Sequence, residues 1–148
     1  MKQNGWNLFI HKLFKNILDR LKNEVIKVKS NDINYKNHPK YKLLAKIREL
    51  IVYTIPGDPL HPRYILTNDL KEWRRVRFRR YRMFFKIFSD KKSLIYIWIN
   101  NEKCLRKEGS KSDVYSVFKN MVKGKKFNPD YYHLIAESKA LENEAYID

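Results

Sequence analysis

Basic side chains are concentrated in the stretch EWRRVRFRRYRMFFKIF, residues 72–88, which holds six arginines between Arg74 and Arg82. A guanidinium group binds phosphate through two parallel hydrogen bonds and can also stack on a flat base. Aromatic rings interleaved with the arginines can stack on unpaired bases, at about 1–3 kcal/mol each. These residue types indicate a surface for RNA, and the plainer alternative is a solvated basic face whose aromatic rings are partly buried.

The spacing within residues 72–100 is that of β-strands, because apolar and charged residues alternate by two. Three strands are predicted, at 72–78, 81–88 and 93–100, and connections this short require antiparallel neighbours. Assigned by composition, one face is aliphatic, with Met83, Phe85, Ile87, Ile95, Ile97 and Ile99. The opposite face is expected to carry Trp73, Arg75, Arg77, Arg82, Phe84, Lys86, Tyr96 and Trp98.

Helices are predicted on both sides of this strand region. Residues 6–29 place apolar side chains three and four apart, and Pro39 can open a second helix. A last helix begins after Ser112, a plausible N-cap, with Asp113 in its first turn, and stops at Gly124. Proline-rich residues 55–64 are predicted to form a loop.

These elements predict an α+β fold, with N-terminal helices packed on an antiparallel β-meander and a C-terminal helix. We expect one domain over residues 1–135 and a short acidic C-terminal tail over residues 136–148. The chain has 148 residues, of which 43% are hydrophobic, and this content excludes a disordered protein.

Charge and cysteine content narrow the partners and the compartment. A net charge of +16 favours nucleic acid, an anionic membrane surface or an acidic protein as partner. No apolar run approaches the roughly 18 residues of a membrane-spanning helix, so no spanning helix is expected. Of these partners, a membrane is not among those predicted. The single cysteine, Cys104, excludes an internal disulfide and fits a reducing cytoplasm.

The combined motifs resemble the YhaV family of toxins from bacterial type II toxin–antitoxin modules, within the RelE-like ribonuclease superfamily. The resemblance covers about residues 4–134, and the chain departs from the family's glycine-containing turn with the tighter RFRRYR. The matching residues are Trp73, RVRF at 75–78, RYRMFF at 80–85, Trp98, Asn100, Glu102, LR at 105–106, Gly109, Lys111, Asp113, Tyr115 and VF at 117–118.

The resemblance implies an endoribonuclease toxin that cleaves mRNA or other cellular RNA without a metal and so inhibits translation. Attack of a ribose 2′-OH on the adjacent phosphate needs a base, cationic donors and an acid. Tyr115 or Lys111 is the candidate base, and an arginine or lysine the proton donor. The candidate catalytic residues are Arg75, Arg82, Arg106, Lys111 and Tyr115. The candidate RNA-binding residues are Trp73, Arg77, Arg80, Phe84, Lys86, Tyr96 and Trp98.

No cofactor or metal is expected, because the four histidines show no ligand spacing and the acidic residues do not cluster. The resemblance also implies a cognate PrlF-type antitoxin, in a hetero-oligomer that binds its own operator DNA. An acidic antitoxin segment covering the basic face would suit the charge.

Two other functions stay open at this point. The same face could belong to a non-catalytic RNA- or ribosome-binding protein, including a decayed toxin, with Tyr115 in ordinary helix packing and Arg106 in a salt bridge to Glu102 or Glu108. A duplex-DNA-binding protein is disfavoured, because the arginines lie on predicted strands and no recognition helix is evident.

Overall fold

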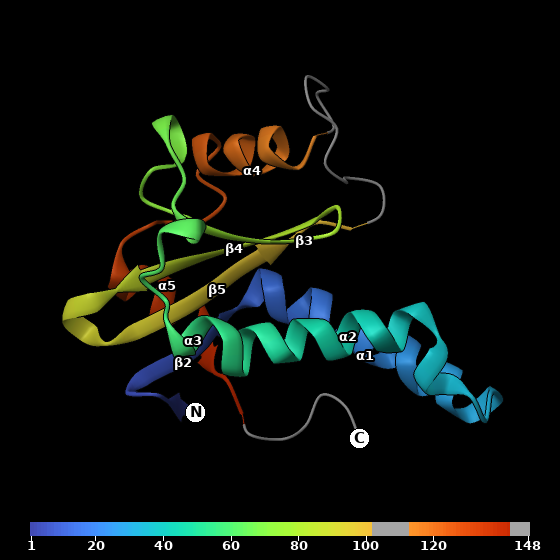
Figure 1. Ribbon diagram of the computed structural model, residues 1–148. Helices are drawn as coiled ribbons and strands as arrows, with labels where there is room; N and C mark the ends of the chain where they lie inside the picture. The colour runs from blue at the N-terminus through green and yellow to red at the C-terminus, as the bar shows by residue number, and fades with distance from the viewer. Residues whose placement is uncertain (102–112, 143–148) are drawn as a thin grey trace.

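The computed structural model describes residues 1–101 and 113–142. The strands are β1 (Lys2–Gln3), β2 (Trp6–His11), β3 (Arg74–Phe78), β4 (Tyr81–Phe88), β5 (Ser93–Ile99) and β6 (Ser138–Ala140). The helices are α1 (Lys12–Asn31), α2 (Pro39–Glu49), α3 (Ile55–Gly57), α4 (Val114–Lys123) and α5 (Tyr131–Ala136). One mixed sheet in the order β1-β2-β5-β4-β3, with β6 also on β2, has α1 to α3 on one face and α4 on the other (Figure 1).

The predicted α+β class and the antiparallel meander are confirmed. β4 pairs antiparallel with both β3 and β5, and the strand ends lie within two residues of the predicted ones. The connection between β3 and β4 is the predicted two-residue turn, in which Arg79 has a φ of 54°. This left-handed conformation favours glycine, so the arginine occupies it at a steric cost.

The predicted helix over residues 6–29 is wrong at its start, because residues 6–11 form β2. Trp6, Leu8 and Ile10 are buried and alternate by two, while Trp6 and Ile10 also fit a helical spacing with the apolar residues that follow. Pairing decides between the two: β2 lies parallel to β5, with Leu8 opposite Leu94. Such a partner distant in sequence is not visible to local periodicity.

A bulge in β5 corrects the predicted faces of the sheet. Phe84 lies opposite Trp98 and Phe85 opposite Tyr96, so Ile97 is the extra residue. The bulge reverses the alternation along β5, and Tyr96 therefore packs on the α1 side with Met83 and Phe85. Ile95 and Ile97, predicted on the aliphatic face, instead join Phe84 on the side of α4.

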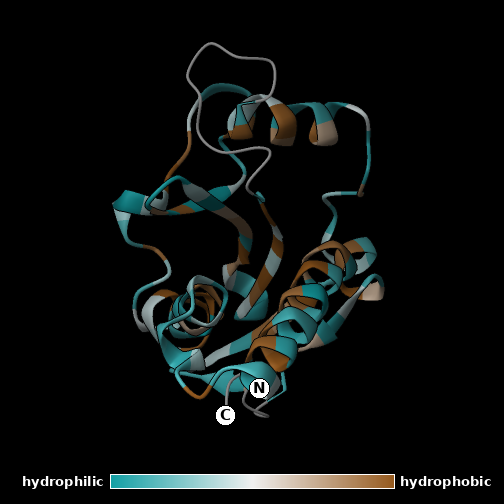
Figure 2. Ribbon diagram, turned by 90° about the vertical axis from the view of Figure 1, so that its right-hand side faces the viewer, coloured by the Kyte–Doolittle hydropathy of each residue, from teal (hydrophilic) through white to brown (hydrophobic). Residues whose placement is uncertain are grey.

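Apolar residues form a core on each side of the sheet. The helix-side core contains Phe14, Leu18, Leu44 and Ile47 of α1 and α2. Apolar and polar residues interleave along these helices, as expected for helices packed on one face (Figure 2). The second core, which we call the α4-side core, contains Leu70, Trp73, Phe84, Ile95, Ile97, Val114, Phe118, Phe127 and Leu134.

Several helix boundaries also differ from the predicted ones. A π-helical turn, Leu50–Thr54, links α2 to α3, so the helical backbone continues to Gly57 where a loop from residue 55 is predicted. The N-cap of α4 is Asp113, whose side chain accepts a hydrogen bond from the Tyr115 N–H, and Gly124 is the predicted C-cap. No helix in the described ranges has the length and apolar content needed to cross a bilayer.

The chain after α5 returns to the sheet. β6 pairs antiparallel with β2, and Leu141 is fully buried in the helix-side core. The part of residues 136–148 that the structure describes is therefore paired and packed. Because its strand is short and its sequence polar, no local pattern predicts this pairing.

His11 links β2, α1 and the returning chain, and it predicts a pH-dependent stability. The ring is fully buried, its Nδ1 caps α1 by accepting from the Leu13 N–H at 3.1 Å, and its Nε2 lies 3.5 Å from Glu137 Oε1. Burial lowers the pKa of His11, against the opposing effect of Glu137. His11 therefore binds a proton more readily in the unfolded chain than in the folded chain. The free energy of unfolding should decrease as the pH drops through about 6.5, the ordinary pKa of histidine.

Urea unfolding between about pH 7.5 and pH 5.5 measures this effect, in the range where histidine titrates. The control is His11→Asn, because an asparagine at the N-cap still accepts from the Leu13 N–H but carries no titrating group. We expect a free energy of unfolding that decreases with pH in the wild type and a flatter profile in the variant. Equal slopes in both would contradict the assignment to His11.

Candidate functional site

Two arginines and one tyrosine meet between the sheet and α4. Arg75 on β3 lies opposite Phe84, and Arg82 on β4 lies opposite Arg77, so all four side chains share the face toward α4. The Nε of Arg82 donates to Tyr115 Oη at 3.1 Å, and Nη1 of Arg75 lies 3.5 Å from the same oxygen. The structure therefore brings together three predicted catalytic residues from three elements.

Backbone carbonyls hold the Arg82 side chain in place. Its Nη1 donates to the carbonyl oxygens of Arg79 and Tyr81, both at 2.8 Å. With Nε directed at Tyr115, the guanidinium plane is fixed at the end of the β3–β4 hairpin. An arginine held in this way loses little conformational entropy when it binds a phosphate.

Asn100 is a positioning residue to which the sequence pattern assigned no role. β5 ends at Ile99, opposite Met83, so the backbone of Arg82, which pairs with Arg77 of β3 on one side, has no strand partner on the β5 side. The Asn100 side chain supplies one: Oδ1 accepts from the Arg82 N–H at 2.7 Å, and Nδ2 donates to the Arg80 carbonyl at 3.2 Å. Asn100 is 2% exposed, so this amide is a buried clamp on the hairpin that carries Arg82.

Arg75 is half-buried beside the loop that precedes β3. Its Nη2 lies 3.5 Å from the carbonyl oxygens of Arg63 and Ile65, and its Nε is buried without a hydrogen-bond partner among the described residues. Burial lowers the pKa of Arg75, with a smaller lowering by the charges of Arg77 and Arg82 and an opposing effect of Tyr115. An anion bound here would offset both the repulsion and the lost hydration.

The first turn of α4 orients Tyr115. Asp113, which is 3% exposed, accepts from the Tyr115 N–H at 3.2 Å and fixes the start of the helix. The tyrosine ring packs edge-on against Phe84, with centroids 5.9 Å apart. Its hydroxyl is thereby directed at the arginines rather than into the α4-side core.

The predicted RNA-binding residues divide into two groups. Arg77 and Arg80 are exposed at the hairpin, and Trp98 is half-buried, stacked on Phe84 and Phe118. The other group is not available to a base in this structure. Trp73 and Phe84 lie in the α4-side core, and Tyr96 is fully buried and donates to the Ile51 carbonyl at 2.7 Å.

Lys86 lies on the predicted face but is directed away from the site. Its Nζ donates to the Pro129 carbonyl at 3.0 Å and sits 5.0 Å from the Trp73 ring centroid. Burial lowers the pKa of Lys86, while Glu72 and Asp130 oppose that effect. The remaining predicted residues, Arg106 and Lys111, lie outside the described residues.

The arrangement combines positive charge with one hydroxyl group. Arg75, Arg77 and Arg82 present cations that can bind a phosphate and stabilise charge that develops on it. The Tyr115 oxygen lies beside two of them, Arg75 and Arg82, and a phenol there can exchange a proton with a hydroxyl that binds within hydrogen-bond distance. In residues 1–101 and 113–142 no three His, Cys, Asp or Glu side chains are grouped to hold a metal ion.

Replacing Asn100 tests the clamp. In Asn100→Ala the Arg82 N–H and the Arg80 carbonyl lose their partner, so the free energy of unfolding should fall by about 1–3 kcal/mol. Cleavage of RNA should also slow, because Arg82 is then held less firmly. The matched control is Asn16→Ala on the exposed side of α1. Urea unfolding measures the stability of the two variants. A stability change no larger than that of the control would contradict the clamp.

The family model and the curated relatives that match this sequence belong to one toxin family. Residues 8–139 match the model of the YhaV toxin family, described as a toxin with endonuclease activity, of a toxin–antitoxin system. The ribonuclease toxin YhaV of Escherichia coli strain K12 is 38% identical over 128 residues, which cover 81% of this chain and 83% of that protein. The RelBE2 toxin–antitoxin complex of Mycobacterium tuberculosis aligns with a TM-score of 0.47 at 13% identity, over 66% of this chain and 92% of that one.

Proposed function

The chain belongs to the YhaV family of endonuclease toxins of toxin–antitoxin systems, and we propose that Arg75, Arg82 and Tyr115 form its RNA-cleaving site. As a ribonuclease toxin it acts on RNA and has an antitoxin as partner. The observation that carries the site is the Tyr115 hydroxyl, which lies 3.1 Å from the Arg82 Nε and 3.5 Å from the Arg75 Nη1.

In the proposed reaction the ribose 2′-oxygen forms a bond to the adjacent phosphorus while the bond from phosphorus to the 5′-oxygen breaks. Arg75, Arg77 and Arg82 bind the phosphate and stabilise the charge that develops on it. The 2′-OH proton passes to Tyr115, with Lys111 as the alternative base, and an arginine or lysine protonates the departing 5′-oxygen. The products are a 2′,3′-cyclic phosphate and a 5′-hydroxyl.

The antitoxin is proposed to be of the PrlF type and to cover this face with an acidic segment, in a hetero-oligomer that binds its operator DNA. The support is charge: the chain carries +16, and three arginines line one face. Calorimetry with the cognate antitoxin and the Arg75→Ala and Arg82→Ala variants tests the masking. Undiminished affinity in both would rule it out. A single cysteine fits action in the cytoplasm.

Cleavage in the presence of EDTA tests the proposed reaction. The purified chain is incubated with a defined RNA, alone and with ribosomes, and with a matched RNA that carries a 2′-deoxyribose at the mapped cleavage position. We expect discrete cuts that end in a cyclic phosphate and that disappear at the deoxyribose. Cuts that persist at the deoxyribose would exclude 2′-OH attack, and cuts that require a divalent metal would exclude a metal-independent reaction. Tight binding without any cleavage would favour a non-catalytic RNA-binding protein.

A further inference from the structure

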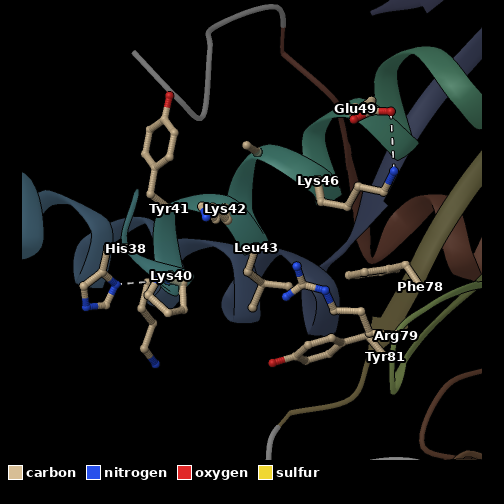
Figure 3. Close-up of a pocket in the computed structure, with 12 residues that line it drawn as sticks. His38, Lys40, Tyr41, Lys42, Leu43, Lys46, Glu49, Phe78, Arg79 and Tyr81 are labelled. Carbon is tan, nitrogen blue, oxygen red and sulfur yellow. Dashed lines mark hydrogen bonds and ion pairs between the residues drawn. The ribbon is translucent and has the colours of Figure 1, made fainter. Parts of the chain in front are cut away.

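A groove lies on the other face of the hairpin that carries Arg82. It has a volume of about 710 Å³ and is bounded by α2 on one side and by the turn between β3 and β4 on the other. Phe78 and Tyr81, which flank this turn, pack on the helix-side core, so their side chains point away from Arg77 and Arg82. Figure 3 shows Leu43 of α2 directed toward Arg79 and Tyr81 across this space.

Rings and cations dominate the lining of the groove. Three lining residues carry phenyl or phenol rings, and Leu43 is the one large aliphatic side chain among them. Phe78 and Tyr81 are stacked, with ring centroids 5.4 Å apart and planes at 20°, and both are half-buried. Such a platform accepts a base on its face, whereas an amphipathic peptide needs several aliphatic pockets.

The charge of the groove is positive and only partly neutralised. Lys40 pairs with Glu24 at 2.6 Å, and Lys46 lies 3.5 Å from Glu49, the one carboxylate of the lining. Lys42 and Arg79 are exposed and have no ion pair within the described residues. Two unpaired cations beside stacked rings are complementary to a phosphate and its base.

The groove and the candidate site share the hairpin turn. Arg79 and Tyr81 line the groove through their side chains, and their carbonyl oxygens accept the two 2.8 Å hydrogen bonds from Arg82 Nη1. A nucleic-acid strand that leaves Arg82 and crosses this turn therefore enters the groove.

We propose that this groove binds a nucleotide of the RNA strand that flanks the cleaved bond. Its base lies against the Phe78–Tyr81 platform, and its phosphate lies between Lys42 and Arg79. The inference rests on the proposed function, because it assumes that RNA is bound at Arg82. It assigns the groove to substrate binding and gives it no part in the chemical step.

Charge reversal on both sides of the groove tests the proposal. The variant is Lys42→Glu with Arg79→Glu, which leaves the Arg79 carbonyl in place. The control reverses two exposed charges on α1, with Arg20→Glu and Lys27→Glu, and so has the same net charge. The probe is a fluorescent single-stranded RNA of about 12 nucleotides. It carries 2′-O-methyl groups, so it cannot be cleaved by 2′-OH attack.

The groove variant should bind this RNA at least about tenfold more weakly than the control. The magnitude of the slope of log K against log salt should be smaller by about 0.7, for the one phosphate that is no longer neutralised. Cleavage of a dinucleotide, which reaches only the candidate site, should be equal in the single variants Lys42→Glu and Lys27→Glu, because both leave the turn that holds Arg82 unchanged. Equal RNA affinity in the two charge-reversed proteins would overturn the proposal. Unchanged RNA affinity with lost antitoxin binding would assign the groove to an acidic protein instead.

The readouts separate this proposal from the proposed function. Binding of the methylated RNA reports on the groove even if the wild type cleaves nothing. If the wild type cleaves the dinucleotide but the groove variant binds the methylated RNA as well as the control does, the proposed cleavage site stands and the proposal for the groove is overturned.

Discussion

Arg82→Ala is expected to lower the single-turnover rate of RNA cleavage by about 10²–10³-fold, the usual effect of removing one donor to developing negative charge. The guanidinium of Arg82 is held more closely than that of Arg75: its contacts with two backbone carbonyls and Tyr115 are 2.8–3.1 Å long, whereas those of Arg75 are 3.5 Å long. Those bonds place its positive charge before the substrate arrives. Binding of a non-cleavable RNA should weaken far less, because Arg75 and Arg77 still face the phosphate.

Two further variants separate geometry from charge at this position. Arg82→Lys keeps the charge but lacks the planar fork, so its cleavage rate should lie between those of the wild type and Arg82→Ala. Arg20→Ala removes the same charge from an exposed position on α1. If Arg82→Ala cleaved RNA as fast as Arg20→Ala does, Arg82 would have no part in catalysis.

Tyr115→Phe is expected to reduce the cleavage rate by about 10²–10⁴-fold, the range for losing a general acid or base. The substitution removes one oxygen and retains the ring that packs against Phe84. Stability and RNA binding should therefore change little. Single-turnover cleavage at saturating protein measures the chemical step, and anisotropy with non-cleavable RNA measures binding.

The control for Tyr115 is Tyr132→Phe, which removes a hydroxyl from a side chain that is 67% exposed on α5. Its cleavage rate should equal that of the wild type. A Tyr115→Phe protein that retained the wild-type rate would transfer the role of base to Lys111, and Lys111→Met would then be expected to abolish cleavage.

The sequence predicts the meander well because alternation by two is a local property of each strand. It also predicts that Arg75, Arg77 and Arg82 share a face, and the observed register of β3 and β4 confirms this. It fails on β5, where one extra residue reverses the alternation and buries Tyr96. It fails on β2 and β6 as well, because both strands depend on partners far away in the sequence.

The site itself is predicted in part. Arginine and tyrosine stand out by their chemistry, and the resemblance placed Tyr115 with them. Asn100 belongs to the matching motif, but its role was not predicted, because that role arises only where β5 ends and the amide takes the place of a strand partner on the β5 side of Arg82. Trp73 and Phe84 resemble base-stacking residues in sequence, yet α4 covers them, and Phe84 stacks on Phe118 at 4.0 Å.

A double-mutant cycle on Arg82 and Tyr115 tests the central claim most directly, namely that these residues act as one RNA-cleaving unit. Single-turnover rates are measured for wild type, Arg82→Ala, Tyr115→Phe and the double variant. If the 3.1 Å contact belongs to the reacting unit, the double variant should cleave little more slowly than the slower single variant, as for residues that act together. A double variant whose loss equals the product of the two single losses would show that they act independently and would contradict the account.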